Sequence, residues 1–545
     1  MKFEDLSEHQ KQVVTTNNKK IIVLGGAGSG KTTTALFRAR HFLEKEESKP
    51  WYRVLFLTFS RTAVKEIANR SKHILGPITE RIEIHTFHSF SNRMLKSFGR
   101  YAGLGIKSPH FCSGAEAKIL EKSPDHIGYD DLLPIALKII RRPYLKDLLR
   151  KRWPLIICDE FQDTDNSQWE LLQELTQDGS HVLFLADPNQ MIYESFLGSR
   201  GVGPKRLEDA ISYVDLEIDL GEPSHRDPSN VIPAMAKAVR NRQFKDAAVV
   251  TAIEKGRLRV IKNSSDESLI PLLRKEIDRT WNEGCRSIGI FGHGNEQVAH
   301  LSSELDIDHV LVGLPEAHGE ALSVMETACL YGVGKAQETD LRLRLAVFLT
   351  ASVRSRGGSI PELAKSLRDS EPLPEIVAVG LKESMRKLQE SAKIRLESLV
   401  ETAITLWPSL NIASGKRPWD QSVRNFAAIT KQIQRRIRDG DEFLIELKRR
   451  IEEQRSENFF DLNVGMSRIQ LMNFHQTKGR EADAVIHVYK NDDYFGRESE
   501  PFPQNSRLLY VGLTRARRKN IIILPESPHP LIAPFSEYAC DSFIR

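Results

Sequence analysis

The stretch Ile-Ile-Val-Leu-Gly-Gly-Ala-Gly-Ser-Gly-Lys-Thr-Thr, residues 21–33, decides the fold. Its first four residues form an apolar run of strand length, and this run leads directly into the pattern Gly-x-x-x-x-Gly-Lys-Thr. A strand, a glycine-rich loop and a helix in this order bind phosphate, because glycines let successive backbone N–H groups point at phosphate oxygens. The pattern predicts a nucleotide site made of Gly25, Gly26, Ala27, Gly28, Ser29, Gly30, Lys31, Thr32 and Thr33.

Two residues of this loop carry charge and metal chemistry. Lys31 is expected to reach the β- and γ-phosphates, and the hydroxyl of Thr32 is expected to ligate Mg²⁺. The predicted ligands are therefore ATP and Mg²⁺.

An acidic pair follows a second apolar run, at residues 155–158. Asp159 and Glu160 then lie at the carboxyl end of a predicted strand, which is where α/β folds place ligands. We predict that Asp159 holds Mg²⁺ and that Glu160 orients or deprotonates the attacking water. The alternative, an acidic pair that only caps a helix, has little weight beside a complete phosphate-binding loop.

Short apolar runs recur along the chain and alternate with helical patterns, as buried strands of parallel α/β sheets do. The runs are residues 21–24, 54–57, 155–158, 182–185, 288–291, 484–488 and 521–524. They form two clusters, which predicts an α/β fold with two parallel-sheet cores. Between the clusters, strand signals fade and apolar residues take helical spacing, so a long helical insertion is predicted as well.

These patterns give predicted domain boundaries. The first core comprises residues 1–98 and 127–203, and a short insert at 99–126 interrupts it. The second core comprises residues 204–315 and 463–545, and a helical insert domain at 316–462 interrupts it. Turn residues at 200–204 mark the boundary between the cores.

Composition excludes several classes of protein. The chain has 545 residues, 78 Lys and Arg against 73 Asp and Glu, and five cysteines without a Cys-x-x-Cys pair. Such a chain is too long for a small disulfide scaffold, and any polyanion partner must be met by local basic patches. Because there is no signal peptide and no uninterrupted apolar run of about 18 residues, we predict a soluble cytoplasmic protein without a membrane partner.

The segment Asp159-Glu-Phe-Gln-Asp-Thr164 resembles the second motif of the UvrD/Rep-type superfamily 1 DNA helicases. Other stretches resemble further motifs of that family and occur in its order: residues 6–10, 54–63, 86–88, 185–193, 224–227, 472–483 and 508–517. The resemblance spans both predicted cores and implies two RecA-like domains, one with a short and one with a long helical insertion. ATP would then bind in the cleft between the two domains.

The resemblance assigns nucleotide contacts to residues outside the phosphate-binding loop. Gln10 would read adenine, and His225 would stack on it in place of the family's tyrosine. Gln190 and Arg226 would contact the γ-phosphate, and Glu481 would contact the ribose. Arg515 would complete the γ-phosphate site as an arginine finger supplied by the second core.

The resemblance also implies a track for single-stranded DNA. Its predicted contacts are Thr58, Phe59, Ser60, Arg61, Thr86, His88, Tyr193, Phe196, His475 and Lys478. For Phe59, a place in the core is the alternative to stacking on a base. The chain departs from the family after Tyr193, where the arginine that contacts a phosphate is absent.

Together these features predict an ATP-dependent DNA helicase that moves 3′ to 5′ and serves DNA repair, recombination or anti-phage defence. Its partners would be single-stranded or tailed duplex DNA and a separate nuclease or other protein subunit. Two alternatives remain open at this point. One is an ATP-switched DNA-binding regulator, or a subunit of a helicase–nuclease complex that does not unwind on its own, and the other is a signalling ATPase indifferent to DNA.

Overall fold

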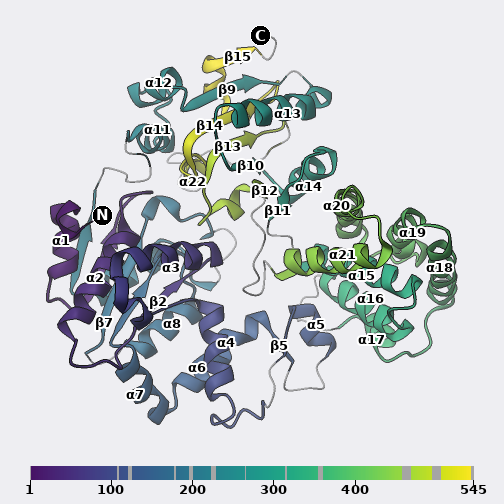
Figure 1. The fold of residues 1–545 in the computed structure, drawn as a ribbon, viewed down its shortest axis with the longest axis horizontal. Helices are drawn as coiled ribbons and strands as arrows, with labels where there is room; N and C mark the ends of the chain where they lie inside the picture. The colour runs from purple at the N-terminus through teal and green to yellow at the C-terminus, as the bar shows by residue number, and fades with distance from the viewer. Residues whose placement is uncertain are drawn as a thin grey trace. The chain divides into compact units, whose positions relative to one another are not determined.

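Two compact units make up the chain, which is described here from a computed structural model. One unit comprises Met1–Lys107, Asp131–Phe291 and Phe474–Arg545, and the other comprises Ser108–Asp130 and Gly292–Asn473 (Figure 1). The structure describes residues 2–106, 110–120, 126–176, 179–194, 200–221, 227, 229–263, 265–312, 316–353, 360–456, 468–491, 493 and 505–541.

A six-stranded sheet in the order β3-β2-β6-β7-β1-β8 forms the centre of the first half of the first unit. Its strands are β1 (Lys20–Leu24), β2 (Val54–Thr58), β3 (Ile82–Thr86), β6 (Leu155–Cys158), β7 (His181–Ala186) and β8 (Leu216–Asp219). All neighbouring pairs are parallel. The carboxyl ends of all six strands therefore meet at one edge of the sheet, and this edge carries the predicted nucleotide site.

Helices cover both faces of this sheet, because successive residues of a buried strand point to opposite faces. Ile21 and Val23 pack on one face with apolar residues of α2 and α3, while Ile22 packs on the other with α4, α6 and α8. The helices of this half are α1 (Glu8–Thr15), α2 (Lys31–Lys45), α3 (Arg61–Leu75), α4 (Phe87–Phe98), α6 (Leu132–Ile140), α7 (Pro143–Arg152), α8 (Asn166–Leu175) and α10 (Pro204–Tyr213).

The second parallel sheet contributes β10, β13, β14, β9 and β15 to the first unit, in that spatial order. Their bounds are β9 (Leu258–Lys262), β10 (Ile288–Gly292), β13 (Ala482–Val488), β14 (Ala516–Leu524) and β15 (Ala539–Asp541). The accompanying helices are α11 (Val231–Arg240), α12 (Ala247–Glu254), α13 (Asp266–Asn282) and α22 (Asn505–Leu513). The predicted α/β fold with two parallel sheets and helical insertions is thereby confirmed.

The first sheet extends beyond the predicted boundary between the cores at residues 203 and 204. Strand β8 pairs in parallel with β1, with Leu24 opposite Asp219, and Ala210 of α10 is buried in the core below the sheet. These contacts place residues 204–219 with the first sheet, although the turn residues at 200–204 had suggested a break.

The second unit is a helical bundle with a small two-stranded sheet attached. Its helices are α5 (Gly114–Ile119), α14 (Asn295–Glu304), α15 (Glu316–Gly332), α16 (Glu338–Ser352), α17 (Glu362–Arg368), α18 (Glu375–Ile394), α19 (Leu396–Ser409), α20 (Lys416–Gln434) and α21 (Gly440–Ser456). Its strands are β4 (His110–Cys112), β5 (His126–Gly128), β11 (Val310–Leu311) and β12 (Ile469–Asn473). Helix α15 is buried along most of its length, as expected for the centre of a bundle.

Residues from the short predicted insert pack against this bundle. Ala115 and Ile119 of α5 belong to the same apolar cluster as α15 and α16. Polar contacts add to the packing: the Ala115 N–H donates to Glu316 Oε1 at 2.7 Å, and Arg344 Nη1 lies 3.0 Å from Glu116 Oε1. The two predicted insertions thus share one core.

Among the described residues, no helix combines the length and the apolar character that a membrane crossing requires. Cys158, Cys285 and Cys329 are buried thiols that form no disulfide.

A buried histidine in the second sheet predicts acid sensitivity. His487 of β13 stacks on Phe474, its Nε2 lies 2.9 Å from Asn520 Oδ1, and burial lowers its pKa to about 4, with Asn520 opposing the shift. The unfolded imidazole titrates near pH 6.5. Between these values the unfolded chain binds a proton that the folded chain does not, so stability falls as the pH falls, by roughly 3 kcal/mol.

We therefore expect the melting temperature of the first unit to fall between pH 7 and pH 4.5, and to fall less in His487→Gln. Glutamine cannot take up a proton but can still donate a hydrogen bond to Asn520. Thermal unfolding at both pH values measures the effect, and His9→Gln, at an exposed position, is the control. Equal losses in wild type and His487→Gln would contradict the assignment.

Candidate active site

The phosphate-binding loop joins the end of β1 to the start of α2. Gly28 and Gly30 have φ values of +80° and +87°, a region that glycine adopts without steric cost. A Cβ atom on Gly25 would lie 2.5 Å from Ser29 Oγ, so a side chain at this position would collide with the loop itself. The loop ends at the N-terminus of α2, whose unpaired N–H groups and dipole favour an anion.

Lys31 lies over the loop that precedes it. Its Nζ donates to the carbonyl oxygens of Gly25 and Gly26 at 2.6 and 3.0 Å. The Ala27 N–H donates to the hydroxyl of Tyr510, which belongs to α22 beside the second sheet, at 3.1 Å. The loop that would receive phosphates therefore follows a strand of the first sheet and contacts a helix beside the second sheet.

The Gln10 amide supports the same loop from outside. Its Oε1 accepts from the Ser7 N–H at 3.0 Å, and its Nε2 donates to the Ser29 carbonyl at 3.1 Å. The first contact closes a capping box at the start of α1. Adenine recognition by Gln10 stays a prediction.

Asp159 and Glu160 follow β6 at the same edge of the sheet. The hydroxyl of Thr32 donates to Asp159 Oδ2 at 3.2 Å, and the Asp159 N–H donates to the Leu57 carbonyl at 2.9 Å. Burial and the neighbouring Glu160 carboxylate raise the pKa of Asp159 to about 6. The Thr32 hydroxyl and the Asp159 carboxylate are both hard oxygen donors, which Mg²⁺ prefers. A divalent cation would also compensate the negative charge of the buried carboxylate, so these two residues fit Mg²⁺.

Glu160 is held in a strained conformation and among positive charges. Its φ of +53° lies in the left-handed region, which costs a non-glycine residue about 1–3 kcal/mol and is typical of functional sites. Gln162 Nε2 donates to Glu160 Oε2 at 2.6 Å. Burial opposes ionisation, but Lys478, Lys31 and Arg515 together lower the pKa of Glu160 below its usual value. Glu160 is therefore ionised at neutral pH and can accept a proton.

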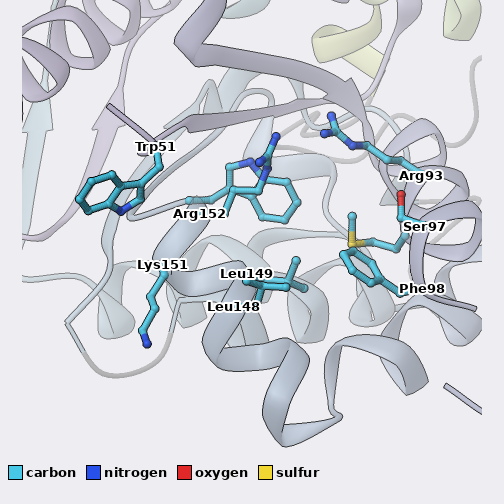
Figure 2. A pocket seen from close by; sticks show the side chains of 10 residues that line it. Trp51, Arg93, Ser97, Phe98, Leu148, Leu149, Lys151 and Arg152 are labelled. Atoms are coloured by element: carbon cyan, nitrogen blue, oxygen red, sulfur yellow. The ribbon is translucent and has the colours of Figure 1, made fainter. Parts of the chain in front are cut away.

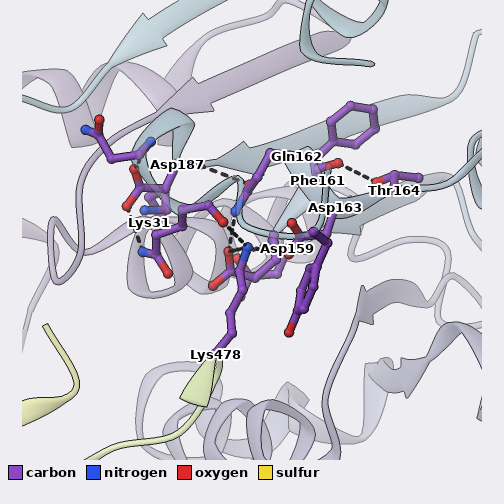
Figure 3. A network of polar contacts seen from close by, with 12 residues as sticks. Lys31, Asp159, Phe161, Gln162, Asp163, Thr164, Asp187 and Lys478 are labelled. Atoms are coloured by element: carbon purple, nitrogen blue, oxygen red, sulfur yellow. Dashed lines mark hydrogen bonds and ion pairs between the residues drawn. The ribbon is translucent and has the colours of Figure 1, made fainter. Parts of the chain in front are cut away.

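Lys478 lies inside this acidic cluster (Figure 3). It pairs with Asp163, its Nζ lies 3.7 Å from Glu160 Oε2, and it donates to the Gln190 carbonyl at 2.7 Å. Burial raises the pKa of Asp163 to about 7, and the Lys478 ammonium opposes this shift. Lys478 follows the 3₁₀ turn Phe474–Thr477 that comes after β12, so this cluster joins residues next to both sheets.

Gln190 and Arg515 meet beside these carboxylates. Gln190 Nε2 donates to Asp187 Oδ2 at 2.7 Å, and Arg515 Nη2 donates to Gln190 Oε1 at 3.1 Å. Arg515 Nε also donates to the Val511 carbonyl of α22, at 2.9 Å. The Arg515 guanidinium is buried and therefore shielded from solvent. Its positive charge can act on an anionic group bound at this site.

The other residues that were predicted to contact the nucleotide are not part of this cluster in the described contacts. Glu481 Oε2 lies 3.0 Å from Arg517 Nε, and its ribose contact stays a prediction. His225 and Arg226 lie outside the described residues. The neighbouring basic side chains are engaged within the protein, since Arg518 donates to the Gly284 carbonyl at 2.7 Å and Lys519 pairs with Glu283.

Several predicted DNA contacts lie close together next to this site. The Tyr193 hydroxyl donates to the His475 carbonyl at 2.9 Å, and Lys478 Nζ lies 5.6 Å from the centre of the Tyr193 ring. A Cβ atom on Gly479 would lie 2.8 Å from Ser60 Oγ, which shows how closely the turn after Lys478 approaches the start of α3. Burial raises the pKa of Tyr193, so its hydroxyl is a proton donor at neutral pH.

The remaining residues that were predicted to contact DNA either have local structural roles or lie outside the residues that the structure describes. Ser60 and Thr86 cap α3 and α4, and the Phe59 ring packs 5.3 Å from that of Phe87. Thr58 is buried and His88 is half-buried. Phe196 and the side chain of Arg61 are not among the described parts.

Sequence reasoning missed three contributors. Gln162 links Glu160 to the Asp187 N–H, Asp187 orients Gln190, and Tyr510 contacts the phosphate-binding loop. All three residues lie within the segments that resemble helicase motifs. Which side chains of one motif contact those of a distant motif follows only from the folded structure.

Two family models match the chain. A model described as an AAA domain matches residues 10–195, and one described as a UvrD-like helicase C-terminal domain matches residues 375–527. The ATP-dependent DNA helicase PcrA of Leuconostoc citreum is 20% identical over 90% of this chain and 78% of its own length. The chain belongs to the UvrD-like superfamily 1 helicase family. The region that the first model matches includes the phosphate-binding loop and Glu160, and the region that the second model matches includes Lys478 and Arg515.

Other UvrD-like relatives show the same distant similarity. The ATP-dependent DNA helicase UvrD1 of Mycobacterium bovis is 22% identical over 98% of this chain and 84% of its own length. DNA helicase II of Escherichia coli K12 is 22% identical over 44% of this chain and 41% of its own length. Enzymes of the UvrD-like family are DNA-dependent ATPases, and the predicted family and enzyme class are thereby confirmed.

Proposed function

We propose that this chain is an ATP-dependent DNA helicase that moves 3′ to 5′ along single-stranded DNA. One observation supports the proposal most directly: two buried cations from beside the second sheet reach the cluster of carboxylates and amides at the carboxyl edge of the first sheet. These are Lys478, which pairs with Asp163 next to Glu160, and Arg515, which donates to Gln190. A site shared in this way changes when the two sheets move relative to each other, as a motor requires.

In the proposed reaction, Lys31 and the loop N–H groups would hold the phosphates of ATP, and Thr32 and Asp159 would hold Mg²⁺. The ion would neutralise charge on the phosphates. Glu160 accepts a proton from the attacking water, while Gln162 fixes the orientation of its carboxylate. Arg515 stabilises the charge that develops on the γ-phosphate.

The link to DNA runs through the contacts around Tyr193. Its ring faces Lys478, which also pairs with Asp163 and lies near Glu160. A DNA strand that stacks on Tyr193 and draws Lys478 toward its phosphates would change the charge next to Glu160. Binding of DNA and hydrolysis of ATP would then influence each other, as reciprocal coupling requires.

Steady-state ATP hydrolysis with and without single-stranded DNA tests this function, with Glu160→Gln as the inactive control. Strong stimulation by DNA that is lost in the variant supports a DNA-tracking motor. A rate that DNA does not change would favour the signalling alternative. Displacement of a labelled strand from duplexes with a 3′ or a 5′ tail then tests unwinding and its polarity, and a protein active on both tails would contradict the 3′ to 5′ assignment.

The biological role we propose is DNA repair, recombination or defence against foreign DNA, in the cytoplasm and together with a separate nuclease or other subunit. Deletion of the gene followed by DNA damage or phage challenge distinguishes these roles. Unchanged survival under both treatments would contradict all of them.

Tyr193→Ala is expected to weaken binding of single-stranded DNA, because the loss of one stacking contact costs about 1–3 kcal/mol. Tyr193→Phe keeps the ring and removes only the hydrogen bond to His475, so its affinity should stay close to that of wild type. Fluorescence anisotropy with a labelled oligothymidine measures both. Equal weakening in the two variants would assign the effect to the lost hydroxyl instead of to stacking.

A further inference from the structure

A pocket of about 400 Å³ opens on the first unit, between the segment that precedes β2, the second half of α4 and the end of α7 (Figure 2). Met94, Leu149 and Trp153 line it and are themselves buried. The Trp51 side chain stands on one side of the pocket and that of Phe98 on the other. A hydrogen bond of 2.8 Å from the Arg53 N–H to the Arg152 carbonyl ties the first segment to α7.

Large apolar side chains around this pocket are exposed. Trp51 is 59% exposed and Leu148 is 52% exposed, and both line the pocket. Tyr144 lies four residues before Leu148 on α7, and therefore on the same face of the helix; it is 56% exposed. Its hydroxyl donates to the carbonyl of Tyr101, whose side chain is exposed as well. Tryptophan, tyrosine and arginine around an apolar centre are typical of protein interfaces.

The pocket is also positively charged. Arg93, Lys151 and Arg152 line it, and among the residues that the structure describes no acidic side chain does. Glu83 of β3 is a carboxylate that pairs with Arg152 and lies 3.0 Å from Arg93 Nη1. Glu83 carries one negative charge against the positive charges of Arg93, Arg152 and the exposed Lys151, so the charge of the lining favours an occupant with negative charge.

Its position separates this pocket from the active site. Trp51 and Trp153 come just before β2 and β6, whereas Thr58 and Asp159 lie at the opposite ends of the same two strands. Strands of four or five residues span roughly 15 Å, so the pocket lies at the amino edge of the sheet and the predicted DNA contacts lie at the carboxyl edge. The basic and aromatic character of the pocket is therefore not explained by the DNA track, which favours a protein as the occupant.

We propose that this pocket binds an acidic segment of a partner protein. The segment inserts one aromatic or large aliphatic side chain between Trp51 and Phe98, and places Asp or Glu residues against Lys151, Arg93 and Arg152. This docking site goes beyond the helicase function and does not depend on it.

The probe is a fluorescein-labelled peptide, Gly-Asp-Glu-Asp-Phe-Asp-Glu-Asp-Gly, titrated with the full-length protein and followed by anisotropy. A second peptide with glycine in place of phenylalanine measures the contribution of charge alone. We expect the phenylalanine peptide to bind at least about tenfold more tightly, a difference of ~1.4 kcal/mol.

Lys151→Glu and Leu148→Ala test the pocket itself, and each should weaken the phenylalanine peptide at least about tenfold. Lys138→Glu, an equal charge change at an exposed position of the neighbouring helix α6, is the matched control and should leave the affinity unchanged. Melting temperatures verify that the variants fold, and DNA-stimulated ATP hydrolysis by Lys151→Glu should equal that of wild type.

Equal affinity for the two peptides, or equal loss in Lys151→Glu and Lys138→Glu, would overturn the proposal. Displacement of the peptide by oligothymidine would overturn it too, because the pocket would then belong to nucleic acid. Loss of DNA-stimulated hydrolysis in Lys151→Glu would contradict the separation from the active site. An absence of DNA stimulation in the wild type would affect only the proposed helicase function.

Discussion

Arg515→Ala is expected to lower the kcat of DNA-stimulated ATP hydrolysis by about 10³–10⁵-fold, the range that arginine fingers contribute. The Arg515 guanidinium is buried and fixed by Val511 and Gln190, so it stands ready without the cost of ordering a flexible side chain. Since it acts on charge that develops in the transition state, the affinity for ATP should change far less than kcat.

Single-turnover hydrolysis and nucleotide titration separate the two effects. Arg518→Ala, three residues along the same chain segment, removes an arginine that contacts only backbone carbonyls in the described contacts and serves as the control. If Arg515→Ala turned over ATP at the wild-type rate, a site completed by residues from both sheets would be wrong.

Glu160→Gln is expected to lower kcat by about 10²–10⁴-fold, the usual contribution of a general base. Glutamine has the same shape and can still accept the hydrogen bond from Gln162, but it cannot take a proton from water. The variant should therefore bind ATP and remain in the ATP-bound state. Its affinity for single-stranded DNA in the presence of ATP reports on that state.

Rapid-quench measurements with excess enzyme give the chemical rate directly. Glu170→Gln makes the same substitution at an exposed ion pair of α8 with Arg141 and should leave the rate unchanged. A comparable loss in both variants would show that the effect arises from the fold and not from the base.

The prediction from sequence succeeded where a strand is buried on both faces. Continuous apolar runs identified β1, β2, β6 and β7, the four inner strands of the first sheet. The prediction from sequence missed β3 and β8, which form the two edges of that sheet. Edge strands carry polar residues on their exposed sides, as in Leu-Glu-Ile-Asp of β8, and so lack an uninterrupted apolar run. Because β8 pairs with β1, the first sheet extends past the turn residues at 200–204 that had been chosen as the boundary between the cores.

The site was predictable to the extent that each motif contains its own chemistry. The phosphate-binding loop and the acidic pair each follow a strand, and parallel pairing brings them to one edge. Contacts between distant motifs were not predictable in this way. Lys478 was expected to face DNA, but it also pairs with Asp163 beside Glu160, over a separation in sequence that no local pattern encodes.

The packing of α5 against α16 has a consequence for how the chain matures on the ribosome. Arg344 follows its partner Glu116 by 228 residues. At a synthesis rate of about 5–20 residues per second, the short insert waits roughly 10–45 s before its partner helix emerges. During that time Ala115 and Ile119 have no bundle to cover them. The nascent protein thus carries an apolar segment that must avoid aggregation, or be shielded by chaperones, until its second unit is translated.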